Sequence, residues 1–502
     1  MMKVSDQNQC LLSDHSLKGS HMNNRTIKVA DTRKAFGNKN PLITQRLGAD
    51  PYAIVYHDRV YLYMTGDIVE YNTEGIAIDN TYKLINTLNV ISSSDLVNWT
   101  DHGAVRAAGL NGASKWGSNS WAPAVAYKNI NGEDKFFIYF ANGGNGIGVL
   151  TSDSPIGPFV DPLGHALISR DTPNCASVEW LFDPAVLVDN DGKSYIFFGG
   201  GVPGDKYANP GTGRVAELGE DMISLKGEPI SIEIPYLFED SGINRIGDTY
   251  YYSYCSNFNV DPEDAKKLGF GNGEIIYMTS KHPMGPYVLQ GSILKNPGDF
   301  FGCYGNNHHC MFHFQGQMYI AYHSQILEKR LNIPGGYRCT HIDPVKINED
   351  GSIAVITATE TGVDQVKALN PFVRTEAETF GTMGGVSTAL YEEYGLNSGT
   401  GNMVVTDIHT GDWSAVYGVE FGNEGATHFT ASISANSNQT GAIQILLDSL
   451  SGEVVGNLEI TPDTAMGYRE ISIELDNVIK GKHDLIFVFE GEGYTFDYWY
   501  FK

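Results

Sequence analysis

The sequence lacks any apolar run long enough to cross a lipid bilayer, and it has no cluster of basic residues. Its 34 lysines and arginines are outnumbered by 59 aspartates and glutamates, which gives a formal net charge of −25. A surface of this sign repels the phosphate backbone of nucleic acids, whereas it does not repel a neutral polymer. We therefore expect neither a membrane nor a nucleic acid as a partner.

Cysteine is also scarce, and none of the six residues forms a CxxC pair or another spacing typical of metal sites. A chain of 502 residues is long enough to fold without disulfide bonds. We expect buried free thiols, because unpaired cysteine is readily buried. The six positions are Cys10, Cys175, Cys255, Cys303, Cys310 and Cys339.

A secretory signal is absent as well. The first 22 residues end in Gly-Ser-His-Met and are polar and aperiodic, so we interpret residues 1–26 as an expression leader outside the fold. A cytoplasmic protein is the expectation for this chain. Secretion, with a native signal removed before cloning, is the alternative.

Segments with helical periodicity are scarce too, and short runs rich in Tyr, Phe, Ile and Val alternate with turns rich in Gly, Asn and Asp. This pattern predicts an all-β protein. Five segments superpose, each with a short apolar strand, a polar turn and an aromatic-rich strand, and they begin at Asp50, Ala122, Asp183, Glu239 and His308. Their spacing suits the roughly 40–50 residues of a propeller blade plus loops, so we predict a five-bladed β-propeller over residues 27–365. A β-sandwich with coincidental hairpins is the alternative.

Acidic residues begin three of the five repeats, at Asp50, Asp183 and Glu239. Blades pack radially around a central channel, so equivalent positions of the inner strands should meet at one mouth of that channel. Carboxyl groups gathered in this way cannot all ionise at their ordinary pKa values, and we expect at least one pKa to be raised. Such a difference in pKa supplies an acid and a base in one site. The alternative is that each acid caps a turn or pairs with an arginine.

Several motifs in this region resemble those of family 43 glycoside hydrolases. They are GADPYA, SWAP, WLFDPAV, LFEDSGI and GNNHH, in this order. The resemblance implies a five-bladed propeller that hydrolyses glycosidic bonds with inversion of configuration. It assigns Asp50 as the general base, Glu239 as the general acid, and Asp183 as the acid that orients Glu239 and raises its pKa. An inverting enzyme needs such an acid and base about 6.5–9.5 Å apart, so that a water fits between base and sugar.

The resemblance also implies groups around the acids. Arg338, in GGYRCTH, matches an arginine near the base and the sugar. Trp180, Trp121 and Phe258 are candidates to stack on sugar rings, with core packing as the alternative. His308 matches a position where a histidine contacts an ion, commonly calcium, on the propeller axis. An ordinary channel residue stays the alternative, because calcium prefers oxygen ligands.

The pattern changes near Arg374, and residues 373–502 resemble family 6 carbohydrate-binding modules, which are β-sandwiches of the jelly-roll type. The motifs are RTEAETF, GDWSAVYGVEFG, IQILLDSLSGEVVGNLEI and KGKHDLIFVFEGEGYTFDYWYF. The resemblance implies a structural Ca²⁺ held by Glu376, Glu378 and Asp497, a ligand type that suits this ion. The alternative is that these acids only solvate the edge of the sandwich.

The sugar-binding signature of this module is incomplete. Tyr468 stands where such modules usually have a tryptophan, Val405 where another aromatic ring is expected, and Thr495 in place of an asparagine. Because one stacking face is lost, we expect Tyr468 to support weak or displaced xylan binding. A purely structural brace is the alternative.

Together these features predict an exo-acting enzyme that removes α-L-arabinofuranosyl branches from arabinoxylan, as a monomer without an organic cofactor. The acid–base chemistry follows from the three carboxyl groups, whereas the choice of sugar rests on the resemblance. The alternatives are a β-xylosidase, an endo-arabinanase and a non-catalytic carbohydrate-binding propeller. Fructan-cleaving propellers also carry three acids but usually show Arg-Asp-Pro, where this chain reads SRDTP.

Overall fold

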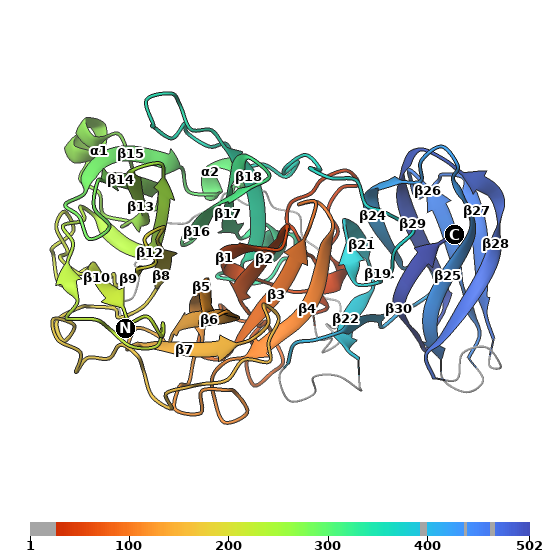
Figure 1. The fold of residues 1–502 in the computed structure, drawn as a ribbon, viewed down its shortest axis with the longest axis horizontal. Coiled ribbons are helices and arrows are strands. Elements are labelled where there is room, and N and C mark those ends of the chain that lie inside the picture. The colour runs from red at the N-terminus through yellow and green to blue at the C-terminus, as the bar shows by residue number, and fades with distance from the viewer. Residues whose placement is uncertain (1–26, 392–398, 436–438, 462–466) are drawn as a thin grey trace.

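The computed structural model describes residues 27–391, 399–435, 439–461 and 467–502. The predicted leader, 1–26, and Cys10 lie outside the described residues. The fold is all-β, as predicted, and its strands form two groups of sheets side by side along the long axis (Figure 1). The arrangement suits a β-propeller followed by a β-sandwich.

The first group contains five sheets among the described residues. The first sheet has β1 (Ala49–Tyr56), β2 (Arg59–Thr65), β3 (Thr87–Ser93), β4 (Trp99–Arg106) and β20 (Thr379–Phe380), and the second has β5 (Trp121–Ile130), β6 (Glu133–Ala141) and β7 (Ile147–Ser152). The third has β8 (Ala185–Val188), β9 (Ser194–Phe198), β10 (Arg214–Leu218) and β11 (Ile230–Ser231). The fourth has β12 (Leu237–Ile246), β13 (Thr249–Ser256), β14 (Ile275–Ser280) and β15 (Val288–Leu294), and the fifth has β16 (His309–Phe314), β17 (Gln317–Ser324) and β18 (Cys339–Val345).

The first strands of these sheets lie around a common centre (Figure 1). Strand β1 contacts β5, β5 contacts β8, β8 contacts β12, β12 contacts β16, and β16 contacts β1. The strand pairings within these sheets are antiparallel in the described residues, and tight turns join β1 to β2, β5 to β6 and β16 to β17. Between β1 and β2 the turn is His57-Asp58, with φ of 45° and 60°, a left-handed pair that matches the twist of the strands. This closed ring brings together residues that are distant in sequence.

Helices are short and peripheral to the sheets. They are η1 (Val29–Asp31), α1 (Pro262–Leu268), α2 (Gly298–Phe301) and α3 (Ile326–Leu331). Helix α1 begins after Asp261, whose side chain accepts hydrogen bonds from two backbone N–H groups, and ends at Gly269 with a φ of 77°. Among the residues that the structure describes, no helix has the length and apolar character needed to span a bilayer.

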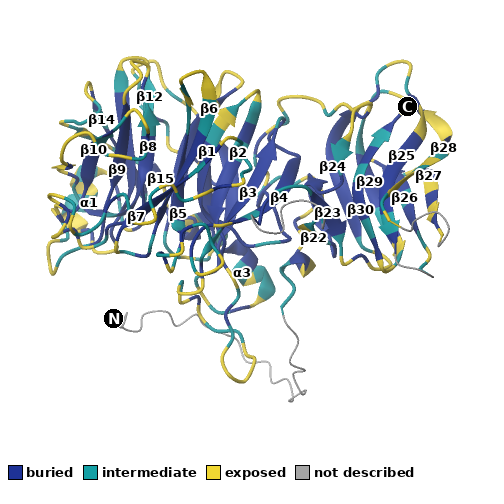
Figure 2. Ribbon diagram, turned by 60° about the horizontal axis from the view of Figure 1, so that its bottom comes forward, coloured by how far each residue is buried: buried dark blue, intermediate teal, exposed yellow. Residues whose placement is uncertain are grey.

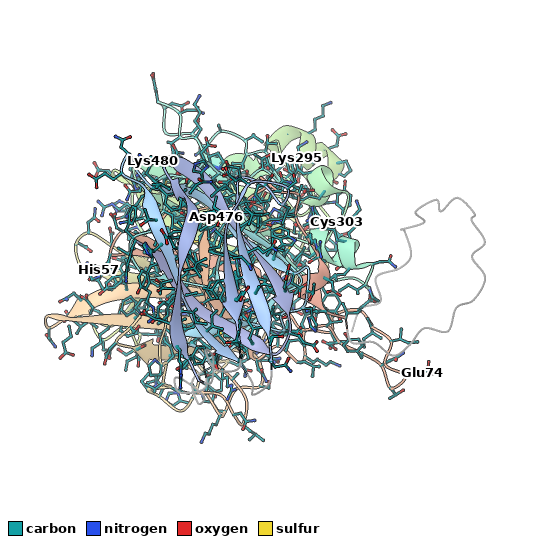
Figure 3. The ribbon with its side chains drawn as sticks, turned by 90° about the vertical axis from the view of Figure 1, so that its right-hand side faces the viewer. His57, Glu74, Lys295, Cys303, Asp476 and Lys480 are labelled. Atoms are coloured by element: carbon teal, nitrogen blue, oxygen red, sulfur yellow. The ribbon has the colours of Figure 1, made fainter. Side chains whose placement is uncertain are left out.

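The second group consists of two facing sheets. One contains β22 (Ser387–Leu390), β23 (Met403–Thr406), β30 (Tyr494–Phe501), β25 (Ala426–Ala435) and β28 (Arg469–Ile479), with β19 (Thr375–Glu376) paired to β30. The other contains β21 (Thr382–Gly384), β24 (Trp413–Glu420), β29 (Lys482–Gly491), β26 (Gly441–Leu447) and β27 (Val454–Ile460). Figure 3 views the molecule from the side of the sandwich, which lies in front, and Asp476 and Lys480 are labelled on it.

Each group encloses its own apolar core, visible as the dark strands in Figure 2. Tyr63, Trp99 and Tyr139 lie in the first core, and Phe487 and Trp499 in the second. Burial of aromatic side chains of this size is the main favourable contribution to folding. Four cysteines are buried and Cys303 is half-buried, and no disulfide occurs among the five that the structure describes.

The two groups are joined by more than the connecting chain. Strand β20 pairs with β4, which adds a segment of the sandwich region to the first sheet. Asp101, on β4, is fully buried and accepts hydrogen bonds from Gln45 at 3.1 Å and from Thr388 of the sandwich at 2.6 Å. Ala30, which the predicted boundaries place in the propeller, packs in the core of the sandwich instead. The N-terminal segment therefore contacts both the propeller-like domain and the sandwich.

Candidate active site

A cavity of about 780 Å³ lies at the ends of the inner strands. All three predicted catalytic acids line it, together with the predicted substrate-binding residues of the first domain and His308. The remaining wall comes from residues that the sequence analysis did not single out. The full lining is Asp50, Tyr82, Trp121, Gly144, Asn145, Arg170, Glu179, Trp180, Phe182, Asp183, Phe238, Glu239, Phe258, Asn306, His308 and Arg338.

Strained backbone marks the points where the inner strands reach this cavity. Asp50, Ala122, Asp183 and Asp240 have φ values of 47°, 36°, 47° and 70°. Positive φ is uncommon in residues other than glycine, costs energy, and tends to cluster at functional sites. The structure thus repeats one unusual conformation at the start of four of the five superposed segments.

The predicted equivalence of Glu239 with Asp50 and Asp183 is wrong by one residue. Asp50 lies six positions before Tyr56, the last residue of β1, and Asp240 lies six positions before Ile246, the last residue of β12. Glu239 nevertheless lines the cavity, because the strand register shifts on both sides of it. Such bulges change the direction in which a side chain points. Sequence reasoning identified the acid but not the bulge that positions it.

Asp50 is buried and paired with a cation. Its Oδ1 accepts a hydrogen bond from Arg338 Nη1 at 2.8 Å, and its backbone N–H donates to His323 Nδ1 at 3.1 Å. Burial alone would raise the pKa of Asp50, but Arg338, His308 and His323 together outweigh burial and lower the pKa below its usual range. Asp50 is therefore a carboxylate near neutral pH.

Asp183 and Glu239 have the opposite character. Burial, and then the negative charge of Asp50 beside Asp183 and of Asp183 beside Glu239, raises the pKa of both carboxyl groups well above the usual range. Asp183 Oδ2 accepts a hydrogen bond from the backbone N–H of Asp240 at 2.9 Å. Glu239 is 7% exposed, and its Oε1 has no hydrogen-bond partner within the described chain. The pair consequently retains a proton near neutral pH, in agreement with the expectation of a raised pKa.

A second carboxylate fixes the direction of Arg338. Asp67 accepts hydrogen bonds from Arg338 Nε at 2.9 Å, from Nη2 at 2.8 Å and from its backbone N–H at 3.0 Å. Both side chains are almost fully buried. The two-pronged contact leaves only Nη1 to reach Asp50, so the guanidinium cannot turn away from the base. Asp67 lies between two repeats, where no sequence pattern indicated it.

Aromatic rings form one side of the cavity. Trp180 packs edge-on against Phe182 at 5.2 Å and Phe238 at 5.1 Å, and Phe238 packs edge-on against Phe258 at 5.2 Å. Phe258 remains 40% exposed, so part of its ring faces solvent. Trp121 donates from Nε1 to the backbone oxygen of Tyr82 at 3.0 Å. These rings are held by one another and present apolar surface toward the acids, as a sugar-binding wall requires.

His308 lies among three carboxyl groups. Its Nε2 lies 3.1 Å from Asp240 Oδ1, and its Nδ1 lies 3.6 Å from Asp50 Oδ1 and 3.7 Å from Asp183 Oδ2. Asp240 also contacts His309 Nδ1 at 2.5 Å. In the part of the chain that the structure describes, no group of three or more His, Cys, Asp or Glu side chains has the arrangement of a metal site. An ion on the axis is not supported by these contacts, and the ligand role of His308 stays a prediction.

The sequence of this chain matches two known protein families. The family described as glycosyl hydrolases family 43 matches residues 38–353. The chain belongs to this family. A second family, carbohydrate binding module (family 6), matches residues 376–502. Family 43 enzymes hydrolyse glycosidic bonds with inversion, so the chain is a glycoside hydrolase.

Arabinoxylan arabinofuranohydrolases resemble this family 43 enzyme over both domains, and an α-L-arabinofuranosidase resembles it over part of the chain. An arabinoxylan arabinofuranohydrolase of Paenibacillus polymyxa is 47% identical over 91% of this chain and 72% of its own length. One of Bacillus subtilis (strain 168) is 48% identical over 93% of each chain. The crystal structure of a Bacillus subtilis arabinoxylan arabinofuranohydrolase in complex with cellotetraose has a TM-score of 0.88 at 47% identity, covering 94% of this chain and 98% of that one. An α-L-arabinofuranosidase of Clostridium thermocellum has a TM-score of 0.50 at 35% identity, covering 64% of this chain and 98% of that one.

The three predicted calcium ligands of the sandwich differ in their hydrogen-bond partners. Both carboxylate oxygens of Glu376 accept hydrogen bonds from Arg374 at 2.9 Å. Asp497 accepts from Asn402 at 2.9 Å and from Ser432 at 3.1 Å. Only Glu378, which is 1% exposed, has a buried oxygen without a partner within the described residues. Calcium binding by these three residues stays a prediction.

The sandwich carries a second cavity, of about 750 Å³, that includes Tyr468 and Thr495. Thr495 donates from its hydroxyl to the hydroxyl of Tyr468 at 2.9 Å. Val405, which stands where such modules have an aromatic ring, is fully buried in the core. Tyr391 instead supplies the second ring, 4.4 Å from the ring of Tyr468. Sequence analysis missed Tyr391 because only the folded loops bring it to Tyr468.

Proposed function

We propose that this glycoside hydrolase removes α-L-arabinofuranosyl side chains from arabinoxylan, one residue at a time from the branch end. The observation that carries the proposal is the similarity to two arabinoxylan arabinofuranohydrolases, at 47% and 48% identity, across both domains. The cavity with its three acids supports a hydrolase rather than a non-catalytic binding protein, because a lectin needs no proton donor.

The proposed roles of the acids follow from their different surroundings. Asp50, ionised beside Arg338, is the general base that takes a proton from the attacking water. Glu239, buried and with a raised pKa, is the general acid that protonates the glycosidic oxygen. Asp183 lies beside it, and its shared proton and negative charge keep Glu239 in the acid form until the bond breaks.

One turnover then consists of two linked proton transfers. The water held by Asp50 attacks the anomeric carbon from the face opposite the leaving xylan chain, and its proton passes to Asp50. The bond between the anomeric carbon and the glycosidic oxygen breaks as that oxygen takes the proton of Glu239. The product is arabinose of inverted configuration. The rings of Trp180 and Phe258 exclude bulk water from this side of the cavity.

We further propose that the five sheets of the first domain are five blades of a propeller. The ring of contacts among β1, β5, β8, β12 and β16 supports this count. In a propeller the first strands face a central channel, and a cavity at their ends is the expected place for a ligand. The matching strained residues at four of these strand starts also fit a repeated blade.

The test is incubation with arabinoxylan, followed by analysis of released sugars and of the length of the backbone. We expect free arabinose and an unshortened backbone. Release of xylose alone would indicate a β-xylosidase, shortening of arabinan an endo-arabinanase, and no release a binding protein.

Substitution of Glu239→Ala should lower turnover by about 10²–10⁴-fold, the contribution of general acid catalysis. Glu233→Ala, at an exposed position outside the cavity, is the control and should match the native enzyme. Equal rates for the native enzyme and Glu239→Ala would remove Glu239 from the mechanism.

A further inference from the structure

Tyr82 lies on the wall of the catalytic cavity in a conformation that tyrosine rarely adopts. Its φ is 60°, in the left-handed region. A bulky side chain at such a φ is an outlier that costs energy, and it persists only where surrounding contacts hold it. None of the sequence motifs includes this residue, which belongs to the segment between β2 and β3.

Several contacts hold Tyr82 in this conformation. Its backbone N–H donates to Asn80 Oδ1 at 2.8 Å, and its backbone oxygen accepts from Trp121 Nε1 at 3.0 Å and from Asn119 Nδ2 at 3.3 Å. The guanidinium of Arg338 lies 5.1 Å from the centre of its ring. Trp121 and Arg338 also line the cavity. The phenol ring is therefore fixed by the same side chains that shape the site.

The contacts described above do not involve the hydroxyl of Tyr82. The side chain is half-buried on the cavity wall, and within the described residues its hydroxyl has no hydrogen-bond partner, so it is open to a bound ligand. Burial raises the pKa of this hydroxyl to about 12. The positive charge of Arg338 opposes this shift, and the negative charges of Asp67, Glu239 and Asp50 add to it. The hydroxyl keeps its proton at every working pH and can donate it in a hydrogen bond.

The acceptor is best supplied by the substrate. The Oδ1 atom of Asp50 already accepts from Arg338 at 2.8 Å, and both oxygens of Asp67 accept from the same arginine. A sugar that enters between Asp50 and Glu239 brings hydroxyl oxygens into the space that Tyr82 borders. We propose that the hydroxyl of Tyr82 donates a hydrogen bond to a ring hydroxyl of the bound furanosyl unit and so contributes to recognition of the cleaved sugar. This inference rests on the proposed function.

The first experiment removes only this hydroxyl. Tyr82→Phe should lower kcat/KM for 4-nitrophenyl α-L-arabinofuranoside about tenfold, the loss of one hydrogen bond to a buried partner. The matched control is Tyr56→Phe, which removes a tyrosine hydroxyl that donates to Asp134 at 2.8 Å and lies outside the cavity. The control should keep the native kcat/KM. Circular dichroism and the Tm of each variant establish that the fold is intact.

The second experiment identifies the acceptor with three substrates that lack the 2-, 3- or 5-hydroxyl of the arabinofuranosyl ring. For the substrate that lacks the partner of Tyr82, the native enzyme and Tyr82→Phe should have the same kcat/KM, while the other two keep the tenfold difference. An unchanged difference for all three substrates, or no difference for the parent substrate, would overturn the inference. If the native enzyme releases no arabinose from arabinoxylan, the proposed function fails, and the inference fails with it.

Discussion

The pairing of Arg338 with Asp50 leads to a prediction about the pH dependence of catalysis. Substitution of Arg338→Met removes the cation whose Nη1 lies 2.8 Å from Asp50 Oδ1. Two unit charges about 4 Å apart in a medium with an effective dielectric constant near 20 interact by about 4 kcal/mol, which corresponds to about 3 pKa units. Burial raises the pKa of Asp50, and without the guanidinium only the weaker effects of His308 and His323 oppose burial.

The sign of the effect follows from the role of Asp50 as the base. Only its ionised form accepts a proton, so a higher pKa moves the acidic limb of the kcat/KM profile toward neutral pH. We expect a shift of about 3 pH units for Arg338→Met, measured with 4-nitrophenyl α-L-arabinofuranoside across the pH range in which the variant stays folded. Loss of substrate binding alone would lower kcat/KM by the same factor at every pH.

Two further variants isolate the electrostatic effect. Arg338→Met leaves Asp67 buried without its partner, which is strongly destabilising, so the double variant with Asp67→Asn preserves the balance of buried charge. This double variant should show the same shifted limb. Asp67→Asn alone retains the contact of Arg338 with Asp50 and should leave the limb where it is in the native enzyme. An acidic limb in both Arg338→Met variants that coincides with the native limb would refute the reasoning.

Two other predictions concern stability and the sandwich. Lys34 is buried, donates to the backbone oxygens of Lys39, Pro41 and Leu42, and has its pKa lowered by burial from 10.5 to about 7. Between those pH values the unfolded chain binds a proton that the folded chain lacks. The free energy of unfolding of the native enzyme should therefore rise with pH, relative to that of Lys34→Met, by up to about 1.4 kcal/mol per pH unit. Chemical denaturation at a series of pH values measures this difference, and an equal pH dependence of unfolding free energy in the two proteins would contradict the prediction. Tyr391→Ala should weaken retardation in arabinoxylan affinity gels about fivefold, by loss of one ring of the sandwich cavity. Both proteins would carry Glu239→Ala to prevent degradation of the gel, and equal retardation would exclude the sandwich cavity as a binding site.

Local patterns in the sequence were sufficient for the fold class and for the three acids. Hairpins depend on neighbouring residues, such as the His57-Asp58 turn, so their repetition is visible in the chain. The acids occupy recognisable motifs at the starts of repeats. The change of composition near Arg374 likewise indicates a second domain. The predicted equivalence of repeat positions was wrong for Glu239. The bulges around Glu239 shift the register of β12, so that Asp240 is the structural counterpart of Asp50.

Residues outside the motifs could not be found in this way. Asp67 and Tyr82 lie in the segment between β2 and β3, and nothing near them in the sequence indicates that Arg338 will lie against both. Tyr391 is similar, since its ring lies 4.4 Å from the ring of Tyr468, from which it is distant in sequence. Ala30 packs in the core of the sandwich because the N-terminal segment crosses from one domain to the other.

The sequence by itself determined which residue types are present, where the chain turns and which segments alternate as strands, because these depend on interactions between neighbours along the chain. The tertiary structure alone decided the ionisation of those residues. Asp50 and Glu239 are both carboxylic acids with similar pKa values in water. They differ here because folding places a guanidinium against one and leaves the other buried beside a second carboxyl group, and electrostatic energy depends on distance in space and on exclusion of water.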